Sequence, residues 1–201
     1  MSELFSIQLQ NRQQQGRDGV WLDLPTTTEQ VQAALRQIGI SSDNPQGLFI
    51  SGYFAEEEKR FAIPYNMVLA SNVDELNFLA SRLETLSTGE RAELNAALQA
   101  PQSELFSIGR ITDFPENVDY YVHLPDVHGP AQLGDYYLNR SGMVDMPEEW
   151  KGGIDTAQFG RYVAQQEQGA FTQYGYLVKS GDAWQKVHEG QPVPEEYRVL
   201  S

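Results

Sequence analysis

Apolar and polar residues alternate along two short stretches near the start of the chain. Residues 4–10 and 20–24 each place apolar side chains at every second position, which is typical of strands that bury one face. Pro25 ends the second stretch, because proline lacks the backbone N–H that a strand needs. The polar link between the two stretches predicts a β-hairpin.

The spacing then changes from two residues to the three and four of a helix. Residues 26–29 (Thr-Thr-Thr-Glu) form a capping box, in which a threonine caps the helix and Glu29 reaches back to the cap. The apolar positions that follow at helical spacing are Val31, Ala34, Leu35 and Ile38, and Gly39 is a natural stop. A third strand at 47–54 completes a β-β-α-β unit, which predicts an N-terminal α+β domain over residues 1–62.

The middle of the chain has only helical periodicity. Ser71-Asn72-Val73-Asp74 opens a first helix, and Ser87-Thr88-Gly89-Glu90 has the pattern of a second capping box. Pro101 ends the second helix. Two short amphipathic helices joined by a tight turn predict a small helical domain over residues 63–101.

The third region mixes both periodicities. Strands are predicted at 120–124 and, as one continuous strand, at 171–179, with helices from Pro130 and over 155–166 between them. These elements predict a C-terminal α+β domain with an antiparallel sheet over residues 102–179. Residues 180–201 contain two prolines and few apolar residues, so a loosely packed tail is expected there.

A six-residue segment occurs twice. Residues 2–7 and 103–108 are both Ser-Glu-Leu-Phe-Ser-Ile, and a Leu-Pro pair follows each copy at a similar distance. One interpretation is two similar edge strands. The other is two related β-hairpin units on either side of the helical domain.

Composition and charge narrow the classes of function. The 201 residues include 28 acidic and 14 basic ones, a formal net charge of −14, with 40% hydrophobic residues and no cysteine. The hydrophobic share predicts a folded chain. The acidic excess argues against binding nucleic acid or an anionic membrane, because both require clustered Lys and Arg. Disulfides and thiol catalysis are excluded.

The chain shows no targeting or membrane signal. The residues after Met1 lack a basic start and an apolar core, and no apolar run approaches the roughly 18 residues of a spanning helix. A cytoplasmic location is therefore expected.

Catalytic motifs are absent from the sequence. It has no glycine-rich phosphate loop, no His-Glu-x-x-His and no nucleophile elbow. His123, Asp126 and His128 lie close together and allow the hypothesis of a small metal-dependent hydrolase. Their spacing matches no standard metal motif, and the preferred interpretation is one histidine at a strand end and one in a loop. We therefore expect a protein that is not an enzyme and needs no cofactor or metal.

Acidic residues are concentrated in the third region. Residues 113–155 carry nine acids against Arg140 and Lys151, a net charge of −7. The nine are Asp113, Glu116, Asp119, Asp126, Asp135, Asp145, Glu148, Glu149 and Asp155. Carboxylates at intervals of about 5–6 Å can imitate the phosphates of duplex DNA, which present one charge per about 1.7 Å of axis. Solubility and helix capping by Asp145 and Asp155 explain the same residues.

Several ordered motifs resemble the ArdA family of antirestriction proteins. They are Gly19–Pro25 (GVWLDLP), Val73–Ala80 (VDELNFLA), Gln132–Tyr137 (QLGDYY), Ile154–Arg161 (IDTAQFGR) and Phe171–Tyr176 (FTQYGY). The second and fourth are the most specific, and together the set spans about residues 4–178.

The resemblance implies a fold and a function. Family members are elongated, non-enzymatic proteins of three small domains that dimerise through the C-terminal part. They mimic bent duplex DNA with surface carboxylates and occupy the DNA groove of type I restriction-modification enzymes, and mobile genetic elements carry them. The nine acids of residues 113–155 would then form the mimic surface. Phe171, Tyr174, Tyr176 and Val178 would lie near a homodimer contact.

The sequence departs from the family pattern in two places. Residues 1–100 carry 13 acids and 7 bases, a net charge of only −6, whereas the first two family domains are strongly acidic. The aromatic residue expected before Ile154 is missing. An alternative hypothesis is therefore a protein-interaction module of a mobile element, with the same fold but another basic partner.

Overall fold

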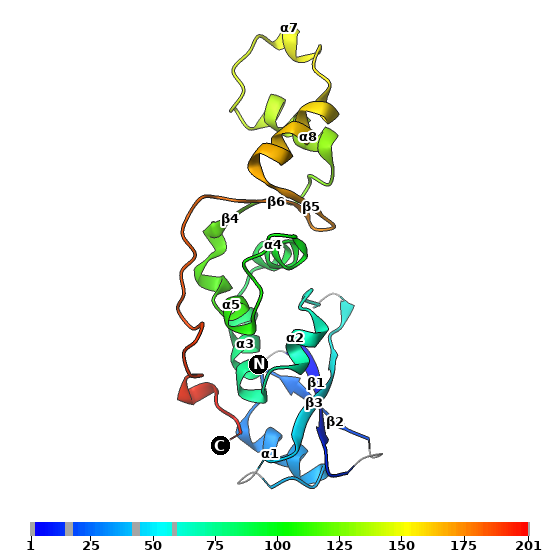
Figure 1. Cartoon of the computed structure of the whole chain (residues 1–201), viewed down its shortest axis with the longest axis vertical. Coiled ribbons are helices and arrows are strands. Elements are labelled where there is room, and N and C mark those ends of the chain that lie inside the picture. Colours follow the sequence, from blue (N-terminus) through cyan, green and yellow to red (C-terminus); the bar gives the residue numbers. More distant parts are fainter. Residues whose placement is uncertain (1–2, 15–17, 42–44, 58–59, 201) are drawn as a thin grey trace. The chain divides into compact units, whose positions relative to one another are not determined.

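The chain has a mixed α+β fold. A computed structural model describes residues 3–14, 18–41, 45–57 and 60–200. These residues contain eight α-helices and two three-stranded antiparallel sheets, which confirms the predicted fold class (Figure 1). Along these same ranges, no helix combines the length and the hydropathy of a membrane span.

The chain forms two compact units. Unit 1 comprises Met1–Ser87, Leu105–Glu116 and Gln185–Ser201, and unit 2 comprises Thr88–Glu104 and Asn117–Trp184. The division into three domains with boundaries at 62 and 101 stays a prediction.

Unit 1 is built on a three-stranded sheet. Its elements are β1 (Phe5–Asn11), β2 (Val20–Leu24), α1 (Thr28–Gln37), β3 (Leu48–Phe54), α2 (Tyr65–Leu69), α3 (Val73–Glu84), α5 (Ile108–Thr112), η2 (Phe114–Glu116) and η5 (Glu195–Tyr197). The strand order is β2-β1-β3, with β1 antiparallel to both neighbours, so the predicted hairpin is confirmed. Alternate residues of β1 (Phe5, Ile7 and Leu9) are buried on one face.

Helix α1 begins at a capping box, as predicted, but with a different partner. The Thr27 side chain accepts a hydrogen bond from the backbone N–H of Gln30, and the Gln30 side chain reaches back to Thr27. The prediction that Glu29 closes the box was wrong, because the cap is one residue later than the spacing from Thr26 suggested. Helix α3 begins within residues 71–74, as predicted. Asn72 caps it, and Glu75 at the third helical position completes a capping box that was not predicted.

The C-terminal segment, defined here as residues 185–200, packs against the other parts of unit 1. The side-chain amide of Asn77 donates to the Tyr197 carbonyl at 3.0 Å, and the Asp74 carboxylate accepts from the N–H of Val199 at 2.8 Å. Val199 is buried, and Phe78 contacts the rings of His188 and Tyr197. The expected loosely packed tail was therefore wrong for this segment.

The repeated segment adopts two conformations. In the first copy Phe5–Ile7 belong to β1, whereas the equivalent residues of the second copy lie outside any strand. There Ser107 caps α5 by accepting from the Arg110 N–H at 3.2 Å. Both sequence interpretations made the second copy a strand, and both were wrong. The residues after Ile108 continue at helical spacing, whereas those after Ile7 alternate. Ser2, the first residue of the repeat, lies outside the described residues.

Unit 2 combines helices with a second sheet. Its elements are α4 (Thr88–Gln99), η3 (Val118–Tyr120), β4 (Tyr121–Leu124), α6 (Pro130–Asp135), the π-helical η4 (Tyr136–Arg140), α7 (Glu148–Lys151), α8 (Thr156–Glu167), β5 (Ala170–Thr172) and β6 (Gly175–Lys179). The strand order is β4-β6-β5. Val127, Leu133 and Tyr176 form the centre of a core that α8 and β5 cover.

The single strand predicted for 171–179 is a hairpin. Strands β5 and β6 pair antiparallel around a tight turn at Gln173 and Tyr174. Gly175 has a φ of +116°, which favours glycine, and a Cβ there would lie 2.4 Å from the Leu124 carbonyl oxygen. The alternating pattern therefore continued through a turn and concealed it.

Helices α6 and α8 cross at a pair of glycines. A Cβ at Gly134 would lie 1.9 Å from the Thr156 carbonyl oxygen, and one at Gly160 would lie 1.8 Å from the Pro130 carbonyl oxygen. The two backbones approach this closely only because neither residue has a side chain. This crossing holds the start of α8 and fixes one end of the loop that joins η4 to α8.

Candidate functional site

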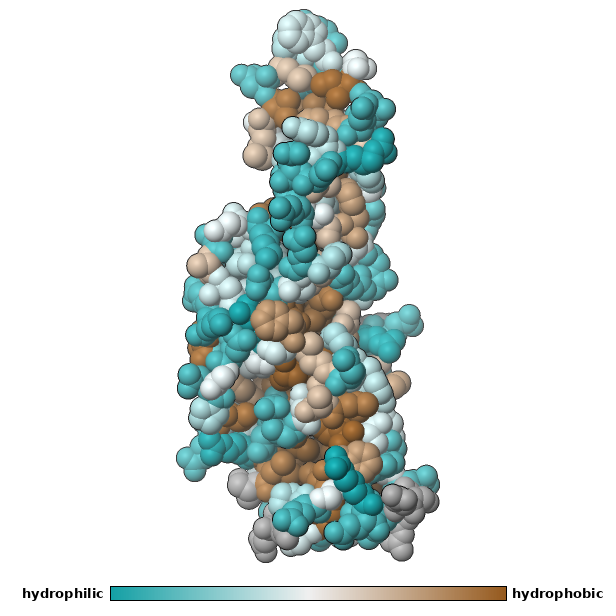
Figure 2. Space-filling view, in the orientation of Figure 1, coloured by the Kyte–Doolittle hydropathy of each residue, from teal (hydrophilic) through white to brown (hydrophobic). Residues whose placement is uncertain are grey.

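Four exposed carboxylates lie on the loop between η4 and α8. We define the α7 acidic loop by Asp145, Glu148, Glu149 and Asp155, all of which are exposed. Figure 1 shows this loop extending away from α8, with α7 at its far end. In Figure 2, hydrophilic and hydrophobic residues are intermingled over the part of unit 2 that carries α7 and α8.

Hydrogen bonds between residues close in sequence stabilise this loop. The Asp155 carboxylate caps α8 by accepting from the N–H groups of Ala157 and Gln158 at 2.9 and 3.0 Å, as predicted. Glu148 pairs with Lys151 at 2.6 Å, yet its side chain is 81% exposed. Asp145 does not cap α7, because Pro147 is the N-cap residue and no side chain bonds there.

Large apolar side chains stand among these carboxylates. Met143 and Trp150 are 74% and 66% exposed. An aromatic side chain surrounded by charges is typical of surfaces that bind proteins, because its apolar area is buried when the partner docks. The α7 acidic loop therefore offers both charge and contact area.

Three further acidic candidates belong to unit 2. Asp119 and Asp126 are exposed, in η3 and in the loop after β4. Asp135 ends α6 and accepts from the side chains of Asn139 and Arg140 at 2.8 and 3.0 Å. Its charge is thereby partly neutralised by a neighbour in the same turn.

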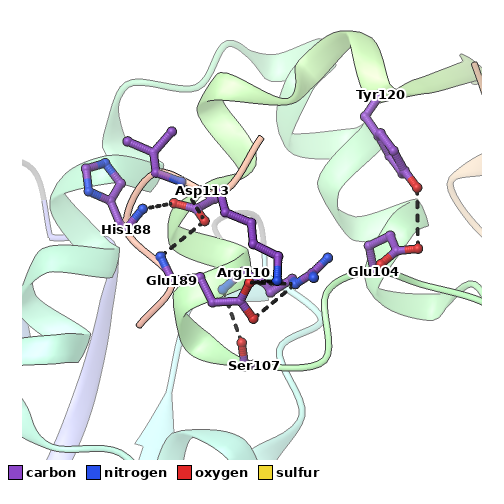
Figure 3. A network of polar contacts seen from close by, with 9 residues as sticks. Glu104, Ser107, Arg110, Asp113, Tyr120, His188 and Glu189 are labelled. Carbon is purple, nitrogen blue, oxygen red and sulfur yellow. Dashed lines mark hydrogen bonds and ion pairs between the residues drawn. The ribbon is translucent and has the colours of Figure 1, made fainter. Parts of the chain in front are cut away.

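Asp113 is a buried anchor, and its assignment to a surface was wrong. Its side chain is 0% exposed and lies in unit 1. The carboxylate accepts hydrogen bonds from the N–H groups of Val187, His188 and Glu189 at 3.3, 2.6 and 3.2 Å (Figure 3). Beside it, the Arg110 guanidinium pairs with Glu189 at 3.1 Å. Desolvation acts to raise the pKa of the Glu189 carboxyl, but Arg110 and Lys186 together outweigh it and lower that pKa.

Glu116 also belongs to unit 1. It forms an ion pair with Arg82, and its side chain is 30% exposed. The structure therefore divides the nine acids predicted to form one surface: Asp113 and Glu116 fall in unit 1, and the other seven fall in unit 2.

Sequence reasoning missed a carboxyl group on α4. Glu93 lies next to Glu90 and Asp119, and burial together with these two charges raises its pKa to about 8. Its Oε1 atom is buried without a hydrogen-bond partner. The sequence showed which positions of α4 are apolar. It did not show which glutamate of this helix would be partly buried.

The four residues predicted near a dimer contact differ from one another in burial. Tyr176 is 0% exposed and donates to Glu167 at 3.0 Å, so its place in a contact surface was wrong. Phe171 packs against it with ring centroids 4.9 Å apart. Phe171 and Val178 also line a cavity of about 650 Å³. A dimer contact at Phe171, Tyr174 and Val178 stays a prediction.

His123, one of the three residues considered as metal ligands, makes a contact that supports the fold. His123 Nε2 lies 2.7 Å from the Tyr174 carbonyl oxygen and so ties β4 to the β5–β6 turn. Over residues 3–200, apart from the three internal gaps given above, no three His, Asp or Glu side chains are placed to hold a metal ion.

Comparison with known families accounts for most of the chain. Residues 15–178 match the family described as Antirestriction protein (ArdA). The chain belongs to the ArdA family. A search of curated proteins gives no match. The ArdA region ends before the C-terminal segment, so the carboxylates of Asp74 and Asp113 bind backbone that lies beyond the family match.

Two ArdA-like motifs now have a structural role. Gly134 lies in the QLGDYY motif and Gly160 in the IDTAQFGR motif, and these glycines form the crossing of α6 and α8. Asp155, which caps α8, belongs to the second motif as well. These residues position the α7 acidic loop.

Proposed function

We propose that this ArdA protein is an antirestriction protein that mimics duplex DNA and inhibits type I restriction-modification enzymes. In this proposal its carboxylates occupy the groove in which the enzyme binds DNA. The protein acts without catalysis or a cofactor. It functions as a homodimer in the cytoplasm, and a mobile genetic element carries it.

The match to the antirestriction family over residues 15–178 carries the proposal. The exposed carboxylates of unit 2 supply its physical basis. Unit 2 contains twelve acidic and five basic residues, a net charge of −7. A DNA-binding groove lined with Lys and Arg attracts such a surface, because its charges complement those that normally meet phosphate.

The α7 acidic loop is the part best suited to this contact. Glu148 and Glu149 are adjacent on a four-residue helix, and Asp145 and Asp155 flank it. Neighbouring exposed carboxylates resemble successive phosphates in charge. Trp150 and Met143 add apolar area that DNA lacks, so they would strengthen the complex without imitating a phosphate.

A restriction-protection assay tests the proposal. Purified protein is titrated against a type I enzyme cutting duplex DNA, at several salt concentrations. We expect stoichiometric inhibition that weakens as salt rises, because screening acts on exposed charges. Glu148→Lys/Glu149→Lys should raise the inhibitor concentration needed by about tenfold, at roughly 0.5–1 kcal/mol for each reversed charge.

A matched control separates position from net charge. Glu195 and Glu196 are also exposed, and they follow a proline and precede an aromatic residue, as Glu148 and Glu149 do. Glu195→Lys/Glu196→Lys changes the net charge equally but lies outside the family match, so inhibition should be retained. Equal loss in both variants would contradict the assignment to the α7 acidic loop. Absence of inhibition by the wild-type protein would refute the proposed function.

A further inference from the structure

The sheet of unit 1 has a second face that carries aromatic side chains. Gln8 of β1 pairs with Trp21 on one side and with Gly52 on the other, and Ser6 pairs with Phe54. Because paired residues point to the same face, Trp21 and Phe54 lie on the face opposite the buried Phe5, Ile7 and Leu9. Their side chains are 49% and 56% exposed.

The arrangement of these rings depends on Gly52. A Cβ at position 52 would lie 3.0 Å from Cη2 of Trp21. Trp21 is on β2 and Gly52 on β3, so the indole reaches across β1 and lies along the sheet surface. Phe54 meets it edge to face, with centroids 6.5 Å apart and an interplanar angle of 73°. The result is an aromatic surface that is open to solvent, in which the two rings stand nearly perpendicular to each other.

The three strands contribute one charged side chain to this face, and its charge is negative. Asp23 is the only charged side chain in β1, β2 and β3. It is exposed, it lies two residues from Trp21 on the same face, and its Oδ1 accepts from the Ser6 hydroxyl at 2.8 Å. Two residues along a strand span about 6–7 Å, so one planar cation could contact both the indole and the carboxylate.

These features fit the guanidinium group of arginine. It is planar, it stacks on aromatic rings, and its fork of donors binds a carboxylate. The chain already contains such a contact, because the Arg12 guanidinium lies 5.5 Å from the centroid of Phe49. Phe49 pairs with Gln10 and therefore belongs to the same face. A nucleic-acid base would also stack on these rings, but Asp23 and the net charge of −14 repel its phosphate.

We propose that Trp21, Phe54 and Asp23 form an arginine-docking surface for a basic protein partner. The identity of that partner as a DNA-binding enzyme rests on the proposed function. The surface lies in unit 1, so it is separate in the chain from the α7 acidic loop. A partner that binds DNA through arginine side chains could use one of them here.

Indole NMR signals can test this surface directly. The chain has three tryptophans, so ¹⁵N-labelled protein gives three indole N–H signals, and Trp21→Phe identifies the one from Trp21. The protein is titrated with a tri-arginine peptide, a tri-lysine peptide and a ten-residue oligo-dT. We expect a saturable shift of the Trp21 signal with tri-arginine. Tri-lysine should bind about two- to fivefold more weakly, because it cannot stack.

Matched variants assign the contact. Asp23→Asn should weaken tri-arginine binding about threefold, whereas Asp18→Asn removes the same charge outside the strands and should leave it unchanged. Gly52→Ala should displace the indole and reduce the response. If Gly52→Ala disrupts folding, Asp23→Asn still decides the result.

The outcomes that overturn the inference are distinct. The inference is overturned if tri-lysine binds as tightly as tri-arginine. It is also overturned if oligo-dT shifts the Trp21 indole signal, or if tri-arginine does not shift it. Wild-type protein that protects DNA in the restriction assay but ignores tri-arginine would overturn only this inference. Wild-type protein that binds tri-arginine at Trp21 but does not protect DNA in the restriction assay would overturn only the proposed function.

Discussion

The Asp113 carboxylate accepts a hydrogen bond of 2.6 Å from the backbone N–H of His188, 75 positions later in the chain. Two neighbouring N–H groups bond to the same carboxylate. A buried acid thus holds a backbone turn of the C-terminal segment.

Asp113→Ala should destabilise unit 1. Three N–H groups would lose a charged acceptor that is itself buried, so we expect the free energy of unfolding to fall by about 3 kcal/mol. Urea denaturation measures this change. Asp119→Ala removes an exposed carboxylate and serves as the control, with an expected change under about 0.5 kcal/mol. Equal effects in the two variants would argue against an anchoring role for Asp113.

Removal of the C-terminal segment should loosen α3. Ending the chain after Trp184 takes away the backbone that Asp74, Asn77 and Asp113 hold, and it removes both aromatic neighbours of Phe78. Hydrogen exchange should accelerate in α3 and α5 and stay unchanged in β4 and β6. Unchanged protection of α3 would show that the segment packs without stabilising unit 1.

The crossing of α6 and α8 should not tolerate a methyl group. Gly134→Ala places a Cβ against the Thr156 carbonyl, and separation of the helices should lower the free energy of unfolding by about 1–3 kcal/mol or more. Gly152→Ala is the matched control, because no atom lies within 4 Å of its Cβ position and its φ is −63°. Thermal denaturation should separate the two variants. Similar midpoints would mean that the crossing adjusts without strain.

Glu93 should make the protein less stable as the pH rises. Its pKa is raised from 4.5 to about 8 in the folded state, so between these values the folded protein holds a proton that the unfolded chain has released. The free energy of unfolding should therefore fall as pH increases from about 5 to 8. Partial exposure limits the effect to about 1–2 kcal/mol.

A glutamine at position 93 should remove this pH dependence. Glu93→Gln cannot ionise, so its stability should stay level across the same window and exceed that of the wild type at pH 8. Urea denaturation at pH 5, 6.5 and 8 provides the measurement. Glu84→Gln, on a different helix, is the control and should retain the wild-type slope. Parallel slopes in Glu93→Gln and the wild type would refute the assignment.

Local sequence signals predicted most of the regular structure. The alternation in residues 4–10 and 20–24 predicted the hairpin, and residues 71–74 marked the start of α3. Gly134 and Gly160 lay in motifs that the resemblance to ArdA had already singled out. These features depend on neighbouring residues, so the sequence contains them directly.

Features that depend on distant residues could not be predicted in this way. Asp113 looked like one of nine surface acids, and only the position of residues 187–189 shows that it is buried. Ser6 and Ser107 occupy equivalent places in the repeat, yet one lies in a strand and the other caps a helix. In each case a tertiary contact or the following residues decide the conformation.

The anchoring of residues 187–200 on Asp74, Asn77 and Asp113 sets an order of events during synthesis. Residues 117–184 of unit 2 leave the ribosome before the C-terminal segment has been made. Unit 2 can therefore complete its structure first, although unit 1 contains the beginning of the chain. Until the C-terminal segment has been translated, the carboxylates of Asp74 and Asp113 lack the hydrogen bonds from its backbone N–H groups. Completion of unit 1 therefore waits for residues 185–200, which are translated after those of unit 2.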